Sequence, residues 1–295
     1  MTRKISALIL FLFFYFFQFS QKNVMEAPFA MLGPENSTIY TDLKIALKDK
    51  EIVYKLNLND QIIDTAKQFK KIGSLKNVQV MSLMNNNIHK LPEALGEMKS
   101  LIYFSSKGNS IDTLPKSFMN LQNLMYLELH NTKLDSIPYM FGYFYKLKVL
   151  HIQNNQTDTL KLSFALGYLE SLTDLLIYNS PIDSIPSEMG KLKKLKRLSI
   201  IQSSVTYVPY QIGNIKSLQQ LILDNNKLTE LAEEIYHMKK LEYLSIRNNK
   251  FTKLPDNICY LTNLKVLDIR GNSFSELDVA ILKVLLPVGC KIVYK

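Results

Sequence analysis

Apolar and polar positions follow one pattern, about 23 residues long, that recurs from residue 53 to the C-terminal tail. Each copy approximates LxxLxLxxNxLxxLPxxIGxLxx, where x marks a variable position. The copies begin at Val78, Leu101, Leu124, Leu147, Leu172, Leu195, Leu218, Leu241 and Leu264. Their spacing is 23 residues, except for 25 residues between Leu147 and Leu172. A degenerate copy precedes them, with Val53, Leu56, Leu58, Gln61 and Ile63 in the equivalent places.

This period predicts a solenoid, because a unit of this size cannot bury its apolar face alone and must stack on its neighbours. The LxLxx core alternates apolar and polar positions, which predicts a short strand with one buried face, and stacked units place these strands side by side as a parallel sheet. The proline late in most copies favours a return path of short 3₁₀ or extended turns. Lys161 replaces this proline in the copy with two extra residues, so we expect a convex bulge between residues 160 and 165.

Nine matching copies resemble the leucine-rich-repeat family in its 23-residue LPxxIG form, over nearly all of the chain after residue 50. The resemblance implies an α/β solenoid, a horseshoe with a parallel concave β-sheet and short 3₁₀ helices and turns on its convex side. It also implies that the ninth residue of each copy points inward and bonds turn backbone as a ladder. These residues are Asn86, Asn109, Thr132, Asn155, Ser180, Ser203, Asn226, Asn249 and Asn272. Thr and Ser offer fewer hydrogen bonds than Asn does, so we expect a weaker middle of the ladder.

Both ends of the repeat array need caps, because an open solenoid end exposes core. We expect residues 21–52 to form a leader and an amphipathic capping helix, with Leu43, Ala46 and Leu47 on one face. The repeats, about ten of them, should span residues 53–283, and residues 284–295 should form a C-terminal cap that ends in a short strand. Two cysteines lie near this end, Cys259 and Cys290. They are either a disulfide pair or two buried thiols, and the sequence does not decide between these.

The first 20 residues predict a secretory signal peptide, with a basic start, an apolar run from Ile5 to Phe17 and a small residue, Ser20, at the expected cleavage point. The Phe-rich run resembles secretion signals of some bacteria. The alternative is an uncleaved N-terminal membrane anchor, although the run is shorter than the roughly 20 residues of a membrane span. The protein should therefore be secreted or extracytoplasmic.

The net charge is +10, and loss of Arg3 and Lys4 with a signal peptide would leave +8. Basic residues gather at the repeat boundaries and should share one rim: Lys99, Lys146, Lys148, Lys193, Lys194, Lys196, Lys216, Lys239, Lys240 and Lys265. This rim is either a solvated face or a steering surface for an anionic partner. Acidic residues recur in four consecutive copies, at Asp112, Asp135, Asp158 and Asp183. We interpret them as turn caps, and the alternative is a calcium ladder.

The concave face is the candidate binding site, because the third, fifth and seventh residues of each copy should point outward from it. The candidate partner-binding residues are Tyr103, Tyr126, Glu128, His130, His151, Leu176, Tyr178, Arg197, Ile201 and Tyr243. Aromatic and Arg side chains are frequent binding anchors. Apolar residues such as Leu176, Ile201 and Ile222, expected to be exposed, hint at a covered patch. The alternative is ordinary pairing across the strands of the sheet.

Glu128, His130 and His151 form the one group with chemical potential, with His151 opposite Glu128 on the next strand. A flat sheet spreads them too widely for tetrahedral zinc. We therefore expect a salt-bridged His–Glu pair and no metal site.

These patterns favour a non-enzymatic, secreted recognition module that binds a partner protein through its concave face. The chain has no nucleophile elbow, no phosphate-binding glycine loop and no His–Glu zinc motif, and the repeats leave no room for a catalytic domain. We expect no cofactor and no small-molecule substrate, and a secreted location argues against nucleic acid. The alternative is a surface adhesin or scaffold that binds an anionic glycan or a cell surface through the basic rim.

Overall fold

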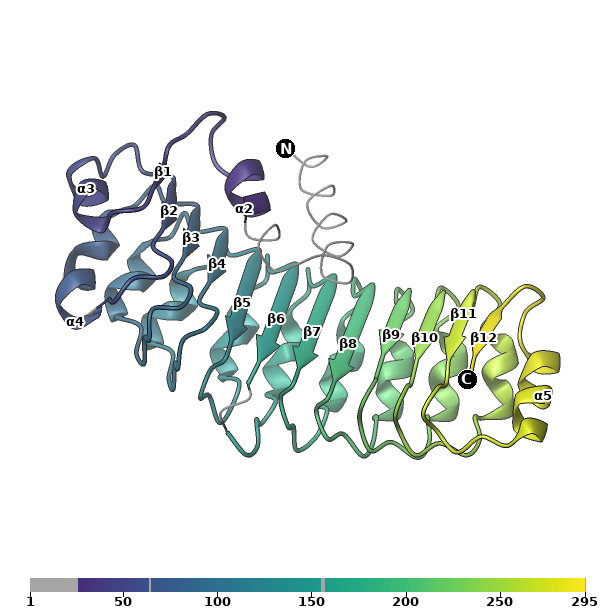
Figure 1. Ribbon diagram of the computed structural model, residues 1–295. Helices are drawn as coiled ribbons and strands as arrows, with labels where there is room; N and C mark the ends of the chain where they lie inside the picture. The colour runs from purple at the N-terminus through teal and green to yellow at the C-terminus, as the bar shows by residue number, and fades with distance from the viewer. Residues whose placement is uncertain (1–25, 64, 155–156, 295) are drawn as a thin grey trace.

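The computed structural model describes residues 26–63, 65–154 and 157–294. Within these residues, twelve strands form one parallel sheet in strict chain order (Figure 1). The strands are β1 (Ile39–Tyr40), β2 (Lys55–Asn57), β3 (Val80–Ser82), β4 (Tyr103–Ser105), β5 (Tyr126–His130), β6 (Val149–Gln153), β7 (Asp174–Tyr178), β8 (Arg197–Ile201), β9 (Gln220–Ile222), β10 (Tyr243–Ser245), β11 (Val266–Asp268) and β12 (Lys291–Val293). The expected solenoid is confirmed. Strands β2 to β11 belong to the repeats, and β1 and β12 come from the flanking segments.

One apolar spine runs along the inner side of the sheet. Leu127, Leu150, Leu175 and Leu198 face one another in register on β5 to β8, and each is at most 2% exposed. Full burial of a leucine contributes about 1.5–3 kcal/mol. Because every unit adds leucines to the same spine, the core is continuous from one end of the ribbon to the other.

Short 3₁₀ helices stack in a row behind the sheet (Figure 1). They are η1 (Phe69–Ser74), η2 (Glu93–Glu97), η3 (Lys116–Asn120), η4 (Tyr139–Tyr143), η5 (Phe164–Tyr168), η6 (Ser187–Lys191), η7 (Tyr210–Asn214), η8 (Glu233–His237) and η9 (Asp256–Tyr260). A proline stands at the N-cap of six of them, as at Pro186 with φ −62°. The repeat glycine lets neighbouring helices touch: a Cβ on Gly190 would lie 2.2 Å from the Gln211 carbonyl oxygen.

The copy with two extra residues differs from our expectation. Ser163, not Lys161, takes the place of proline at the start of η5, and its Oγ accepts a hydrogen bond from the Ala165 amide at 3.1 Å. Lys161 pairs with Ser136, two residues before Pro138. The prediction of a convex bulge was therefore wrong, since the insertion precedes Leu160 and η5 has the length of its neighbours. Asp158 consequently does not share the position of Asp135.

The inward ladder is present and is uneven. The Asn109 side chain accepts hydrogen bonds from the amides of Asn86 (3.0 Å) and Ile88 (2.9 Å) and donates to the Leu83 carbonyl at 2.7 Å. Ser203 Oγ donates to the Ile201 carbonyl at 3.0 Å. The buried Thr132 hydroxyl has no hydrogen-bond partner among the described residues. The middle of the ladder thus makes fewer bonds, as expected.

One expected member of this ladder, Asn155, lies outside the described residues. Its neighbour Asn154 is fully buried and bonds the Leu134 carbonyl.

The helices α3 (Leu43–Lys48) and α4 (Thr65–Gln68) lie beside the first units of the repeat array. Asp42 caps α3 by accepting hydrogen bonds from the amides of Lys44 (2.6 Å) and Ile45 (3.1 Å). Ala46 is buried in the core. Leu43 and Leu47 are partly buried and pack against the same core. The helix α3 therefore covers the open end of the spine.

The C-terminal end closes with α5 (Glu276–Leu285) and β12, which pairs with β11. A capping box between Ser275 and Asp278 starts α5, and the helix crosses the boundary that we expected at residue 283. Cys259 and Cys290 are free, partly exposed thiols. The expected signal peptide, residues 1–20, lies outside the described residues.

Candidate binding face

Outward side chains of the sheet line up in columns because the register of the strands is unbroken. The first column runs through Lys55, Val80, Tyr103, Tyr126, Val149, Asp174, Arg197, Gln220, Tyr243, Val266 and Lys291. The second includes Glu128, His151, Leu176, Ser199 and Ile222. The third includes His130, Gln153, Tyr178 and Ile201. The predicted alignment of the candidate residues, including His151 opposite Glu128, is confirmed.

The first column is covered at its N-terminal part. The helix α2 (Glu26–Met31) and the residue after it place Phe29 and Leu32 against Val80, Tyr103, Tyr126 and Val149. Tyr103 and Tyr126 are only 3% and 1% exposed. The expectation that they are exposed was therefore wrong, because a segment read as a loose leader lies over them.

A buried polar group follows on the same face. The Tyr103 hydroxyl donates to Glu128 Oε2 at 2.9 Å, His151 Nδ1 lies 3.9 Å from Glu128 Oε1, and the rings of His130 and His151 are 6.5 Å apart. Glu128, His130 and His151 are all buried, so their expected exposure was also wrong.

Burial governs the charge of this group, because desolvation disfavours charged forms. It raises the pKa of Glu128, lowers the pKa of His130 to about 3 and lowers the pKa of His151 to about 4. His151 is consequently neutral near pH 7, and the expected salt bridge to Glu128 does not form there. Among the described residues, no group of three or more His, Cys, Asp and Glu could hold a metal ion.

The charged pair Asp174–Arg197 comes next along the first column. Burial raises the pKa of Asp174, and the neighbouring guanidinium partly opposes this. The pair separates the covered N-terminal part of the column from its C-terminal part.

The C-terminal part of the face carries the accessible candidates. Tyr178 is 39% exposed, and Leu176, Ile201 and Tyr243 are partly exposed. Ile222, expected to be exposed, is buried at 3%. Beyond them Arg270 binds the buried carboxylate of Asp268 with two nitrogens, Nε at 3.0 Å and Nη2 at 2.5 Å. This region therefore combines an aromatic ring, aliphatic side chains and fixed charges.

Two lysines of the expected basic rim influence each other's charge. The pKa of Lys148 is lowered by burial and by the charge of Lys194, which places two lysines of different units close together. Elsewhere the rim is partly neutralised, as where Lys265 pairs with Glu242 at 2.7 Å.

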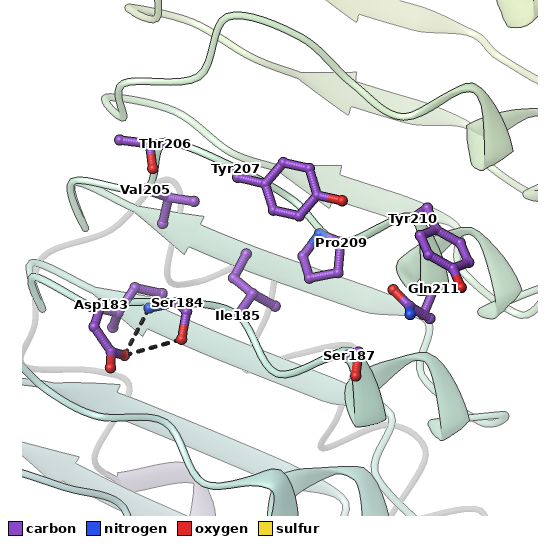
Figure 2. Close-up of a pocket in the computed structure, with 11 residues that line it drawn as sticks. Asp183, Ser184, Ile185, Ser187, Val205, Thr206, Tyr207, Pro209, Tyr210 and Gln211 are labelled. Carbon is purple, nitrogen blue, oxygen red and sulfur yellow. Dashed lines mark hydrogen bonds between the residues drawn. The ribbon is translucent and has the colours of Figure 1, made fainter.

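A surface pocket of about 450 Å³ lies away from these columns, between the segments that lead from β7 to η6 and from β8 to η7 (Figure 2). Tyr207 and Tyr210, both about half exposed, line it together with Asp183, Ser184 and Gln211. Asp183 already accepts hydrogen bonds from the amide (2.7 Å) and hydroxyl (3.4 Å) of Ser184. This carboxylate thus supports its own turn, as the capping interpretation expects.

Family profiles match most of the chain. The profile described as "Leucine-rich repeat region" matches residues 41–179 and 140–246, and "Leucine Rich repeats (2 copies)" matches residues 239–279. The chain belongs to the leucine-rich-repeat family. No curated protein matches it.

Solved leucine-rich-repeat structures share its fold. The functional domain of InlJ from Listeria monocytogenes superposes with a TM-score of 0.61 at 23% identity, covering 77% of this chain and 46% of that one. The internalin InlF from Listeria monocytogenes gives 0.57 at 18%, covering 84% of each chain. The plant peptide hormone receptor RGFR1, solved in complex with RGF2, gives 0.56 at 22%, covering 81% and 46%. This chain spans less than half the length of the InlJ and RGFR1 chains, and at such identities the likeness shows the fold alone.

Two surface features of this leucine-rich-repeat protein were not predicted from the sequence. The first is the cover formed by Phe29 and Leu32, which their three-residue spacing could have suggested. The second is a set of exposed aromatic residues on η4 and η5, including Tyr139 and Phe164, which lie outside the repeat consensus. Within the described residues, no helix is both long and apolar enough to cross a membrane.

Proposed function

We propose that this protein is a secreted, non-enzymatic recognition module that binds a partner protein through the concave face of its sheet. The observation that carries the proposal is the unbroken register of outward columns, which fixes side chains from successive strands on one rigid surface. A rigid surface favours recognition because few groups must be ordered on binding.

The open part of the face is the proposed contact area. Leu176, Tyr178, Ile201 and Tyr243 supply apolar and aromatic anchors, and Arg197 supplies a charge. Glu128, His130 and His151 form the neighbouring floor. The structure of RGFR1 in complex with RGF2 supports a binding role, since it pairs the same fold with a partner.

The test is capture of partners from native extracellular material by the immobilised full chain. A double variant, Tyr178→Ala with Tyr243→Ala, should lose a specifically captured protein by at least about tenfold, the loss of one modest hot spot. The matched control is Tyr260→Ala, because Tyr260 is exposed on the convex helix η9. Equal capture by all three proteins would place the contact elsewhere.

Secretion rests on residues 1–20, whose pattern predicts a cleaved signal peptide. Mass spectrometry of protein collected outside the producing cells should show an N-terminus at Gln21. An intact N-terminus recovered with membranes would support the anchored alternative.

A second function, binding of an anionic glycan or cell surface as an adhesin or scaffold, is favoured by the crowding of Lys148 and Lys194. Binding to dextran sulfate should then weaken steeply as salt rises, because exposed charges are screened within about 10 Å at 0.1 M. Reversing Lys194 and Lys196 to Glu should abolish it. Capture that is insensitive to salt and to these changes favours the concave face.

A further inference from the structure

The covered part of the concave face is an apolar surface on which a segment of the same chain packs. Val80, Tyr103, Tyr126 and Val149 follow one another in register across β3 to β6, and we call these four residues the aromatic seat. Phe29 and Leu32 pack on it and are 5% and 6% exposed. Phe29 belongs to α2 and Leu32 is the residue after it. Because both pack against the same four residues, the occupant presents a Phe and a Leu to the seat.

The chain after α2 continues along the same column. Gly33 turns with φ +82°, and a Cβ there would lie 3.0 Å from Lys55 Cε. Lys55 is the member of the first column that precedes Val80, and it is buried. The segment thus follows the column from strand to strand, along the path that a concave-face ligand would take.

The seat has defined ends. Lys55 borders it on one side and the Asp174–Arg197 pair on the other. Three strand spacings of about 4.8 Å make it roughly 14 Å long. A helix of about nine residues spans this length, at 1.5 Å per residue. The six residues of α2 leave part of it to a longer helix.

The occupant is held by apolar packing rather than by hydrogen bonds. Among the described residues, no hydrogen bond joins residues 29–32 to the sheet. The hydroxyl of Tyr126, at the centre of the seat, is buried without a hydrogen-bond partner among those residues. An unsatisfied buried hydroxyl is unfavourable, so a ligand that offers it an acceptor gains a hydrogen bond that the present occupant does not make.

We propose that the aromatic seat is a docking site for a short amphipathic helix of a partner protein, with a Phe and a Leu three positions apart, and that residues 29–32 of this chain fill it until such a helix displaces them. This proposal rests on the proposed function, because both place the partner on the concave face. It names the kind of helix that the covered part of the face would bind, whereas the capture test concerns the open part.

The first experiment asks whether the seat is filled in the intact chain. The chain has no tryptophan, so Phe29→Trp introduces a single reporter. Its emission should be blue-shifted and protected from acrylamide. The control Tyr139→Trp, at a position 67% exposed, should be red-shifted and quenched. Identical emission and quenching of the two reporters would overturn the proposal. The proposal would also fail if light scattering showed that the Phe29→Trp variant is a dimer and if dissociation of that dimer exposed the indole.

The second experiment asks whether the seat accepts a helix in trans. The probe is a fluorescein-labelled synthetic peptide with the sequence of residues 24–35, followed by anisotropy. The full-length double variant Phe29→Ser with Leu32→Ser, which empties the seat, should bind it at least tenfold more tightly than wild type does. A control peptide with Ala at both positions should not bind. Equal binding to wild type and the emptied variant would overturn the proposal.

The outcomes separate the two ideas. Adding Tyr178→Ala and Tyr243→Ala should leave unchanged both the emission of the Phe29→Trp reporter and the peptide binding of the emptied variant. If the peptide fails while capture remains sensitive to Tyr178 and Tyr243, the seat is a permanent structural contact and the proposed function stands. If the peptide binds while capture is insensitive to those residues, the seat accepts a helix and the contact proposed at Tyr178 and Tyr243 is wrong.

Discussion

Burial, not pairing, sets the chemistry of single residues on the concave face. His130 and His151 lie beside one another on β5 and β6, and each is kept uncharged near neutral pH because desolvation lowers its pKa. Glu128 is affected in the opposite direction, since burial raises its pKa. The two histidines of this group are thus uncharged near neutral pH, and the buried Glu128 carboxyl lies beside His151.

Acid should destabilise the protein through these histidines. Burial lowers the pKa of His130 to about 3 and that of His151 to about 4. In the unfolded chain both histidines have a pKa near 6.5, so the unfolded chain binds protons first as the pH falls. Their stabilising effect is complete above pH 6.5 and is lost as the pH falls towards 4 for His151 and towards 3 for His130, by about 2 kcal/mol per histidine at pH 5. Glu128 opposes this, because a raised pKa favours the folded state at low pH. Chemical denaturation of wild type and His130→Gln at pH 7 and pH 5 isolates the His130 effect: the loss between the two pH values should be smaller in the variant, and parallel losses would contradict it.

Ladder residues should differ in their importance. Asn109→Ala removes two accepted hydrogen bonds and the donations to the Leu83 and Ser106 carbonyls, and should cost about 4 kcal/mol at roughly 1 kcal/mol per bond. Ser203→Ala removes a single donation to Ile201 and should cost about 1 kcal/mol. Urea unfolding of the two variants measures the difference, and equal losses would show that the number of bonds is not what matters.

At the scale of the element, the spacing between 3₁₀ helices varies along the row. A Cβ on Gly190 would meet the Gln211 carbonyl oxygen at 2.2 Å, whereas on Gly142 the nearest atom would be Ala165 Cβ at 3.6 Å. The wider gap falls between η4 and η5, beside the copy with two extra residues. The same consensus glycine therefore has two different roles.

Alanine at these two glycines should act with opposite sign. Gly190→Ala forces η6 and η7 apart and should cost about 1–3 kcal/mol. Gly142→Ala fits in ordinary contact and should stabilise by about 0.4–1 kcal/mol, because it restricts the unfolded chain. Thermal melts of both variants against wild type provide the measurement. Destabilisation by Gly142→Ala would mean that η4 and η5 are packed more tightly than they are here.

The repeat period was enough to predict the strands, their register and the outward columns, because each depends on local pattern alone. Register then placed His151 opposite Glu128 correctly. The burial of Tyr103 and Tyr126 could not be predicted in this way, since it depends on Phe29, which is far from both along the chain and outside the period. The misplacement of Lys161 has a related cause: counting from the strand ignores where in a unit an insertion falls, and Ser163 preserves the helix start by capping in place of proline.

For the whole molecule, order along the ribbon follows order along the chain, so each unit packs on the units before and after it (Figure 1). Stability in such an array is the sum of unit and neighbour terms. The two ends differ from the middle because α3 covers one and α5 with β12 closes the other. A defect near one end should therefore remain local.

Leu267→Ala tests this on β11. Leu267 is fully buried, and its truncation should cost about 2–5 kcal/mol. Because the loss enters only local neighbour terms, amides of β10 to β12 and α5 should lose hydrogen-exchange protection while those of β3 to β6 keep theirs. Val284→Ala is the matched control in the adjacent C-terminal cap, since Val284 is 85% exposed on α5, and it should change neither region. A uniform loss of protection from β3 to β12 would show instead that the spine unfolds as one cooperative unit, in which case displacement of α2 at one end would be felt at the other.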